Sequence, residues 1–282
     1  MCLNRVAVFA IKIFPKELAS RIMGAISDKG LPKIILIPWI KSYCKIFGVD
    51  MSESEKSVRE FNTFNEFFIR ELKAGVRNID SSKKSIISPV DGTITEFGKI
   101  EKDIFMQAKG KTYSLESLLQ NHGTAKKFEG GSFATIYLSP KDYHRIHSPV
   151  SGKIAGYSYI PGSLFPVGNF SSVNIGGLFL KNERLITYME YPKGNLAIVK
   201  IGACTVGRIR TSYENRVFDT SMKTKIEKKY AKKIPVKKGE EIGRFELGST
   251  VVLLFKRSSI NFEKISKGDR IRMGERIASI TD

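Results

Sequence analysis

Ser88-Pro89-Val90-Asp91-Gly92-Thr93-Ile94 is repeated 60 residues later as Ser148-Pro149-Val150-Ser151-Gly152-Lys153-Ile154. A shorter pair of similar stretches follows at Lys238–Gly243 and Lys267–Ile271. From about residue 85 onward, short alternating or apolar runs are punctuated by glycine, which is typical of strands joined by turns. Repeated strand–turn units indicate a sheet that folds over on itself. We therefore predict an α+β, mostly β fold: an antiparallel β-sandwich or barrel-like core with glycine-rich strand–turn units, preceded by short amphipathic N-terminal helices.

The first 60 residues have a different pattern. Apolar residues recur at helical spacing from Val6 to Phe14, Pro15 interrupts them, and they resume from Leu18 to Ile26. Lysines and arginines are interleaved throughout, and Trp39 follows an apolar run, where an interfacial anchor would lie. Such helices either lie in the plane of an anionic membrane or pack as a bundle on the neighbouring domain. We predict a membrane-associating helical segment at 1–60 and a main domain at 61–282.

Charge is the unusual feature of the composition. The 282 residues include 47 basic and 28 acidic side chains, a formal net charge of +19, which favours polyanions such as nucleic acid or an anionic bilayer. The apolar runs Val6–Ile11 and Ile34–Ile40 are too short to cross a bilayer, and no secretory cleavage pattern follows the first run. The scattered cysteines Cys2, Cys44 and Cys204 predict neither a disulfide framework nor a cysteine zinc site, which fits a reducing compartment.

Two stretches stand out by their charge alone. Ile154 to Leu180 contains no charged residue, which predicts a buried hairpin with a glycine-rich tip or an apolar rim facing lipid. Met222 to Lys238 carries eight lysines against Glu227 alone, which predicts a solvated loop or a collector of anionic headgroups.

The chain has three histidines. His122 lies in a polar turn, whereas His144 and His147 lie together beside Asp142. Their spacing would place both rings on one face of a helix but on opposite faces of a strand. A zinc hydrolase using the pair is one hypothesis, but a third ligand at motif spacing is missing, so we predict no metal. A nucleic-acid binder is another, suggested by the charge alone, since no binding motif is present.

Gly248-Ser249-Thr250 lies between two apolar runs and by itself is typical of a turn. A glycine before a serine is also what an intramolecular acyl shift needs, because the glycine carbonyl is uncrowded and its backbone tolerates strain. Serine becomes a nucleophile when a histidine held by an aspartate takes its proton. Asp91, His147 and Ser249 are candidates for such a relay.

Several motifs together resemble the phosphatidylserine decarboxylase family, in the family's order and over roughly residues 60 to 282. They are Ser88–Gly92, Tyr143–Pro149 and Leu247–Thr250, supported by Phe64–Leu72, Lys181–Arg184 and Ile201–Gly207. Two departures are minor: Asn78 stands where proline is common, and the loop Pro161–Asn169 is only loosely similar.

The resemblance implies that the chain cuts itself at Gly248–Ser249 into a β chain, 1–248, and an α chain, 249–282. Asp91 orients His147, which deprotonates Ser249, and Ser249 becomes a covalent pyruvoyl group (pyruvate). This zymogen would then decarboxylate phosphatidylserine through a Schiff base, giving phosphatidylethanolamine and CO2. His144 would protonate the product or place the carboxylate, and Asp142 would support either histidine.

The resemblance also implies partners and a location. The two fragments would form a heterodimer, with a further homo-oligomer left open, on the cytoplasmic side of the cell membrane as a peripheral protein. Other pyruvoyl decarboxylases act on soluble amines, but the basic, apolar N-terminus and the segment from Tyr143 to His147 favour the lipid enzyme. The expected partner is an anionic membrane surface, with no nucleic acid.

Overall fold

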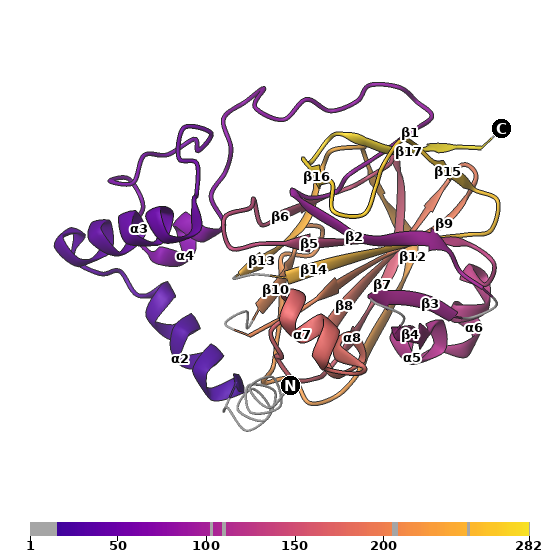
Figure 1. Cartoon of the computed structure of the whole chain (residues 1–282), viewed down its shortest axis with the longest axis horizontal. Helices are drawn as coiled ribbons and strands as arrows, with labels where there is room; N and C mark the ends of the chain where they lie inside the picture. Colours follow the sequence, from indigo (N-terminus) through magenta and orange to yellow (C-terminus); the bar gives the residue numbers. More distant parts are fainter. Residues whose placement is uncertain (1–15, 102–103, 109–110, 205–207, 247–248, 282) are drawn as a thin grey trace.

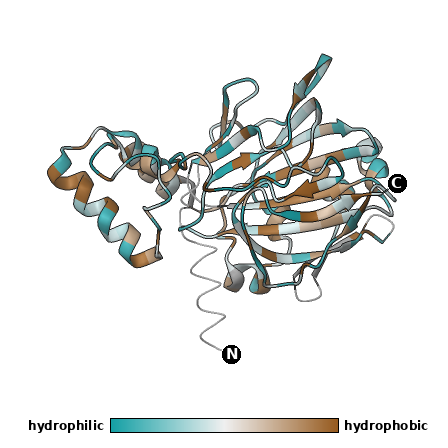
Figure 2. Ribbon diagram, turned by 90° about the horizontal axis from the view of Figure 1, so that it is seen from above, coloured by the Kyte–Doolittle hydropathy of each residue, from teal (hydrophilic) through white to brown (hydrophobic). Residues whose placement is uncertain are grey.

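The computed structural model describes residues 16–101, 104–108, 111–204, 208–246 and 249–281 (Figure 1). The helix predicted between Val6 and Phe14, and Cys2, lie outside the described residues. A group of N-terminal helices stands at one side of a larger β core (Figures 1 and 2). The predicted short N-terminal helices, followed by a mostly β core, are thereby confirmed.

From Lys16 onward, where the described residues begin, the N-terminal group contains three helices: α2 (Lys16–Asp28), α3 (Lys33–Phe47) and α4 (Phe64–Phe68). α3 ends at Gly48, whose positive φ of 72° is favourable for glycine. Thr63 caps α4 by accepting a hydrogen bond from the Glu66 N–H. The Trp39 ring stacks on Phe64 with centroids 4.2 Å apart, which packs α3 on α4. None of the helices in the described ranges is long and apolar enough to cross a membrane.

The main sheet has eight strands in the order β12-β7-β8-β9-β14-β5-β2-β16. Their bounds are β12 Ile226–Val236, β7 Gly152–Ile160, β8 Arg184–Tyr191, β9 Gly194–Ile201, β14 Ser249–Phe255, β5 Ser132–Leu138, β2 Gly92–Lys99 and β16 Arg270–Ile271. The sheet is open, with β12 and β16 at its edges. In the central strand β14, residues Val251–Phe255 are all buried, as an unbroken apolar run requires.

Two smaller sheets complete the sandwich-like core. The four-stranded sheet has the order β11-β10-β13-β6 and the three-stranded sheet the order β1-β17-β15. Their bounds are β11 Arg216–Asp219, β10 Arg208–Thr211, β13 Glu241–Glu246, β6 Arg145–His147, β1 Ser85–Ile87, β17 Arg276–Ile280 and β15 Ile260–Phe262. All paired strands among these elements are antiparallel, as predicted, and apolar residues line the strands (Figure 2).

The remaining elements lie outside these sheets. β3 (Ile104–Ala108) and β4 (Lys111–Ser114) form a hairpin. Short helical elements cover the ends of the core: α5 Leu115–Leu119, α6 His122–Ala125, η1 Lys126–Phe128, α7 Asn169–Asn174 and α8 Leu178–Lys181. The buried guanidinium of Arg184 donates to the carbonyls of Ser117, Leu118, Leu180 and Asn182, which fixes α5 and α8 on β8.

For each of the two stretches with unusual charge, the structure contradicts one of the two interpretations, the loop and the hairpin. Much of the lysine-rich segment is not a loop but the edge strand β12, paired with β7. Exposed lysines on an edge strand discourage further strand pairing, which gives them a structural role. The uncharged stretch Ile154–Leu180 is not a single hairpin, because it forms most of β7, then α7 and part of α8.

Candidate active site

The two Ser-Pro-Val turns pack against each other at the centre of the candidate site. The Ile87 N–H donates to the Pro149 carbonyl at 3.0 Å, and the His147 N–H donates to the Pro89 carbonyl at 2.8 Å. Each strand end therefore hydrogen-bonds to the other copy of the turn. This exchange brings the first turn, which carries Asp91, beside the strand that carries His147.

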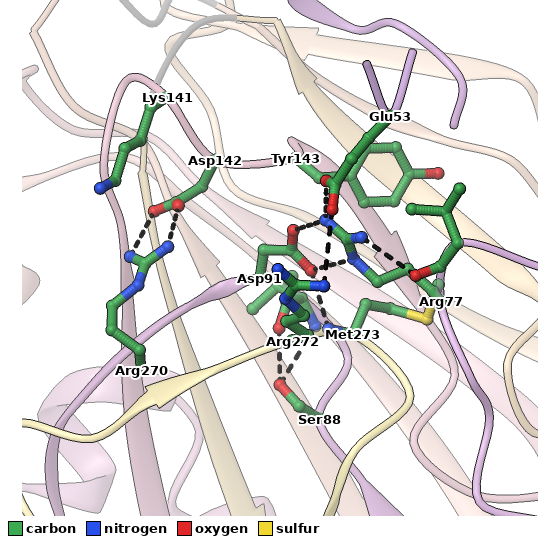
Figure 3. Close-up of polar contacts among 12 residues, drawn as sticks. Glu53, Arg77, Ser88, Asp91, Lys141, Asp142, Tyr143, Arg270, Arg272 and Met273 are labelled. Atoms are coloured by element: carbon green, nitrogen blue, oxygen red, sulfur yellow. Dashed lines mark hydrogen bonds and ion pairs between the residues drawn. The ribbon is translucent and has the colours of Figure 1, made fainter. Parts of the chain in front are cut away.

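The Asp91 carboxylate is buried and held by an arginine (Figure 3). Arg77 donates from Nε to Oδ1 at 3.0 Å and from Nη2 to Oδ2, and the Met273 N–H donates to Oδ1 at 2.8 Å. The same guanidinium donates to Glu53 at 2.7 Å. Burial acts to lower the pKa of Arg77, but the two carboxylates outweigh burial and raise it. Arg77 is therefore a fixed cation beside the first turn.

His147 lies at the end of β6 and makes two ring hydrogen bonds. Nδ1 is 2.8 Å from the Gly239 carbonyl, so it carries the proton and donates. Nε2 then accepts from the Tyr143 hydroxyl at 3.1 Å. Burial lowers the pKa of His147, so the neutral ring, with a basic Nε2, is favoured.

The structure brings Asp91 near His147 but joins them by no direct hydrogen bond within the described residues. The Asp91 charge still acts on the ring, because it favours the protonated form and raises the pKa of His147 against the larger effect of burial. The direct aspartate–histidine contact of the predicted relay is replaced by Arg77 on one side and Gly239 on the other.

His144 lies just before β6 and is fully buried. Its Nδ1 donates to the Asp142 carbonyl at 2.7 Å, and its ring packs on Phe68 with centroids 4.2 Å apart. Nε2 is buried without a hydrogen-bond partner in the described structure. Burial, aided by the nearby Arg70 charge, lowers the pKa of His144 to about 4. His144 therefore presents an unprotonated, unpartnered nitrogen.

Asp142 fixes the loop between β5 and β6. Its carboxylate accepts from the Ser139 N–H and hydroxyl, both at 2.7 Å, and from Arg270 Nη2 at 2.5 Å (Figure 3). Although burial acts to raise the pKa of Asp142, these donors lower it. Because the Asp142 carbonyl holds Nδ1 of His144, the contacts of this carboxylate help to set the position of the histidine.

The predicted cleavage point lies at the same end of these strands. Ser249 begins β14, with its backbone opposite Leu138 of β5. The Phe245 N–H donates to the His144 carbonyl at 3.0 Å, and Glu241 is opposite His147. His144 is thus nearer than His147 to the end of β13. Gly248 and the side chain of Ser249 lie outside the described residues, so the relay geometry at the serine stays a prediction.

A cavity of about 490 Å³ opens between the N-terminal helices and the ends of β5 and β9. Its walls are mainly aromatic and aliphatic: Met23, Trp39, Tyr43, Phe47, Phe64, Phe68, Tyr137, Leu138, Pro140, Pro166, Val167, Gly168, Ala203 and Cys204. Phe68 contributes to this wall and also contacts the His144 ring. An apolar chain in this cavity would therefore end beside His144 and the start of β14.

The site offers little to a metal ion. Within the described ranges, no three His, Cys, Asp or Glu side chains gather as ligands. His144 lies just before β6 and His147 ends it, and their Nδ1 atoms donate to different carbonyls. No pattern in the sequence indicated Arg77 or Arg270 as site residues, because the carboxylates that they bind, Asp91 and Asp142, lie 14 and 128 residues away in the chain.

Comparison with known proteins identifies the chain's relatives. The family model described as phosphatidylserine decarboxylase matches residues 64–279. The phosphatidylserine decarboxylase proenzyme of Myxococcus xanthus (strain DK1622) is 40% identical over 272 residues, covering 96% of this chain and 97% of the relative. The proenzyme of Anaeromyxobacter sp. (strain K) is 39% identical over 275 residues, covering 96% and 97%. That of Shewanella amazonensis (strain ATCC BAA-1098 / SB2B) is 40% identical over 290 residues, covering 99% and 100%.

Proposed function

The chain belongs to the phosphatidylserine decarboxylase family, and from this premise we propose that it cuts itself at Gly248–Ser249 and uses a pyruvoyl group made from Ser249 to decarboxylate phosphatidylserine. The observation that carries the proposal is the grouping of Asp91, His144 and His147 at the strand ends where β13 leads to β14. An orphaned, buried His144 Nε2 at this place fits a group that forms at residue 249.

Self-cleavage uses the neutral His147 as the base. Nε2 of His147 accepts the Ser249 hydroxyl proton while the serine oxygen attacks the Gly248 carbonyl and displaces the peptide nitrogen, giving an ester. Loss of the Ser249 α-proton then expels the Gly248 carboxylate and leaves a dehydroalanine at residue 249. Its imine tautomer takes up one water and releases ammonia, which gives the pyruvoyl keto group. Asp91 favours the protonated ring through its charge, and the Gly239 carbonyl, 2.8 Å from Nδ1, keeps the ring in place. The Tyr143 hydroxyl gives up its hydrogen bond to Nε2 when the serine hydroxyl binds there.

Decarboxylation uses His144. The keto group of the pyruvoyl supplies an electron sink for the substrate amine, as a carbonyl cofactor does. Nε2 of His144 has no other partner, so it can accept a hydrogen bond or a proton from the bound substrate and return the proton after CO2 leaves. The Arg270–Asp142 pair holds the loop that carries this ring.

The fragments would remain together after cleavage. β14, in the 249–282 piece, lies between β9 and β5 of the 1–248 piece and pairs with both. Arg270 and Met273 of the same piece hold Asp142 and Asp91. A heterodimer of the two pieces is therefore the working form that we propose.

An anionic membrane is the proposed partner, with the protein peripheral on the cytoplasmic side of the cell membrane. α2 and α3 expose Leu18, Ile22, Ile34 and Ile35 among lysines, the pattern of helices that lie in a bilayer surface. The aromatic cavity behind them suits the apolar part of a lipid. Replacing Ile22, Ile34 and Ile35 with Asn should reduce co-sedimentation with phosphatidylserine vesicles. Ile104→Asn, at an exposed isoleucine of the β3 hairpin, is the matched control.

Intact mass of the purified protein tests the main proposal. The wild type should give 1–248 and a blocked piece of 34 residues, 249–282 (282 − 248 = 34). Ser249→Ala should stay full-length and should release no CO2 from phosphatidylserine. The pyruvoyl mechanism would be excluded if the wild type stayed full-length and if the wild type and Ser249→Ala both released CO2 at the same rate.

A further inference from the structure

Helix α2 turns its polar side to the protein and its apolar side outward. Ser20 and Ser27 are 1% and 0% exposed, whereas Leu18, Ile22 and Ile26 are 57%, 50% and 40% exposed. A helix that packs on a domain normally buries its apolar stripe. Burial of apolar surface therefore contributes little to the seating of α2, and polar contacts must position it.

Asp28, the last residue of α2, makes the main polar contact. Its carboxylate receives Nη1 and Nη2 of Arg208 from β10, at 2.5 and 2.7 Å, and the Asn65 amide from α4 at 2.9 Å. This bidentate geometry, with two parallel hydrogen bonds, is the strongest form of an arginine–carboxylate pair. Asp28 thus joins α2 to α4 and to the four-stranded sheet.

Arg208 connects Asp28 to Glu246 at the end of β13, the strand that precedes the predicted cleavage point. Its Nε lies 2.7 Å from Glu246 Oε2, and Nε of Arg210 lies 3.0 Å from the other oxygen, Oε1. The Glu246 side chain is only 2% exposed, ends β13 and precedes Gly248 by two residues. A carboxylate so buried requires cationic partners. Arg208 is therefore held by Glu246 in the orientation that receives Asp28.

Burial acts to lower the pKa of Arg208, but Asp28 and Glu246 outweigh it and raise the pKa, so the guanidinium stays charged between them. A cavity of about 280 Å³ borders the pair, with walls from α2, β10 and Glu246. Water in this cavity would weaken an isolated surface pair. Here the buried Glu246 orders the arginine beforehand, which favours its pairing with Asp28.

We propose that Asp28 is a positioning residue that couples the seating of the lipid-facing helix α2, through Arg208 and Glu246, to the geometry of the chain at Gly248–Ser249. Self-cleavage then reaches its full rate when α2 is seated, and a lipid surface that orders α2 accelerates it. This inference rests on the self-cleavage proposed above and adds a regulator to it.

Cell-free synthesis of the full chain, with and without anionic phosphatidylglycerol vesicles, tests the coupling. Intact mass follows the disappearance of the precursor. We expect vesicles to accelerate cleavage of the wild type. We expect Asp28→Asn to cleave about tenfold more slowly, equal to about 1.4 kcal/mol of barrier, and to respond to vesicles little or not at all. Asp28→Glu should restore much of the rate, because it keeps the carboxylate.

Glu190→Gln is the matched control. It removes one negative charge from the ion pair between Glu190 and Lys233, which lies at the β12 edge of the main sheet. It should cleave like the wild type. Thermal melting of Asp28→Asn in a Ser249→Ala background checks its folding. If Asp28→Asn does not fold, Arg208→Lys replaces it as the test variant. It keeps the positive charge but loses the bidentate hydrogen bonds to Asp28, so it should cleave as slowly as we expect for Asp28→Asn. The coupling is overturned if vesicles change the cleavage rates of the wild type and of Asp28→Asn (or Arg208→Lys) equally, whether both accelerate or neither does. A wild type that never cleaves overturns the proposed function instead.

Discussion

The two Ser-Pro-Val turns share a backbone but carry different chemistry. In each, the serine hydroxyl donates to the valine carbonyl, at 2.6 Å for Ser88 and 2.7 Å for Ser148. In each, the serine also exchanges backbone hydrogen bonds with a Gly-Glu turn, at Gly274–Glu275 for the first copy and Gly239–Glu240 for the second. The same sequence thus forms the same local structure twice.

The differences lie at two equivalent positions. Before the serine, the first copy has Ile87 and the second has His147; after the valine, the first copy has Asp91 and the second has Ser151. Asp91 is buried on Arg77, whereas Ser151 is exposed. Each half therefore supplies one candidate residue, and the exchanged hydrogen bonds bring the two together. A duplicated scaffold provides the positions, and the substitutions provide the chemistry.

Asp91→Ser gives the first turn the residue of the second, and we expect this change to have the largest effect. The charge that favours protonated His147 disappears and Arg77 loses a partner, so self-cleavage should slow by at least about 100-fold. Intact mass at successive times after synthesis measures it. The reciprocal control, Ser151→Asp, should cleave normally, because residue 151 faces solvent. Wild-type cleavage by a folded Asp91→Ser protein would show that the difference between Asp91 and Ser151 has no part in self-cleavage.

His144 has no counterpart in the first half, where Lys84 occupies the equivalent position and is exposed. We expect His144→Ala to cleave itself yet decarboxylate at least about 100-fold more slowly, because only the second step uses its Nε2. Nε2 must be unprotonated, and burial lowers its pKa to about 4. The wild-type rate should therefore not fall on account of this group until the pH approaches 4. A decline centred on the ordinary histidine pKa near 6.5 would contradict this assignment.

Local patterns in the sequence predicted the fold, because turns and strand periods depend on neighbouring residues. The repeated Ser-Pro-Val stretch is an example, since its hydrogen bonds span only two residues. The second pair of similar stretches, Lys238–Gly243 and Lys267–Ile271, predicted the structure less well. Gly268 forms a turn with positive φ like Gly239, as its sequence suggests, but the spatial counterpart of Gly239 at the first serine is Gly274.

The partners of the candidate residues could not be predicted in the same way. The chain has many arginines, and the order of residues does not show which one reaches a given carboxylate. Asp91 takes Arg77, because a bidentate guanidinium is a stronger partner than a neutral imidazole. This competition explains why Asp91 and His147 are neighbours without a direct hydrogen bond.

Gly92→Ala and Gly152→Ala distinguish a loss of stability from a loss of cleavage rate, and we expect smaller effects from them than from the changes above. An added Cβ would lie 2.5 Å from the Tyr137 carbonyl oxygen in the first copy and 2.3 Å from that of Glu190 in the second. Both changes should destabilise the Ser249→Ala protein by about 1–3 kcal/mol in urea unfolding. Only Gly92→Ala should also slow cleavage of the otherwise wild-type chain, because β5 at Tyr137 lies between β2 and the start of β14. Slower cleavage by both variants would trace the effect to stability alone.

Ser88→Ala and Ser148→Ala should have the smallest effects. Each removes one buried hydroxyl and leaves a valine carbonyl without that donor, at a cost of about 1 kcal/mol in urea unfolding. The double variant is the sharper measurement. Because Ile87 and His147 each donate to the proline of the opposite turn, loosening one turn should already weaken the other. We therefore expect the combined loss to differ from the sum of the single losses by about 0.5 kcal/mol or more. Additive losses would mean that the two turns are neighbours without being coupled, so that a change in one half would leave the position of the candidate residue in the other half unaltered.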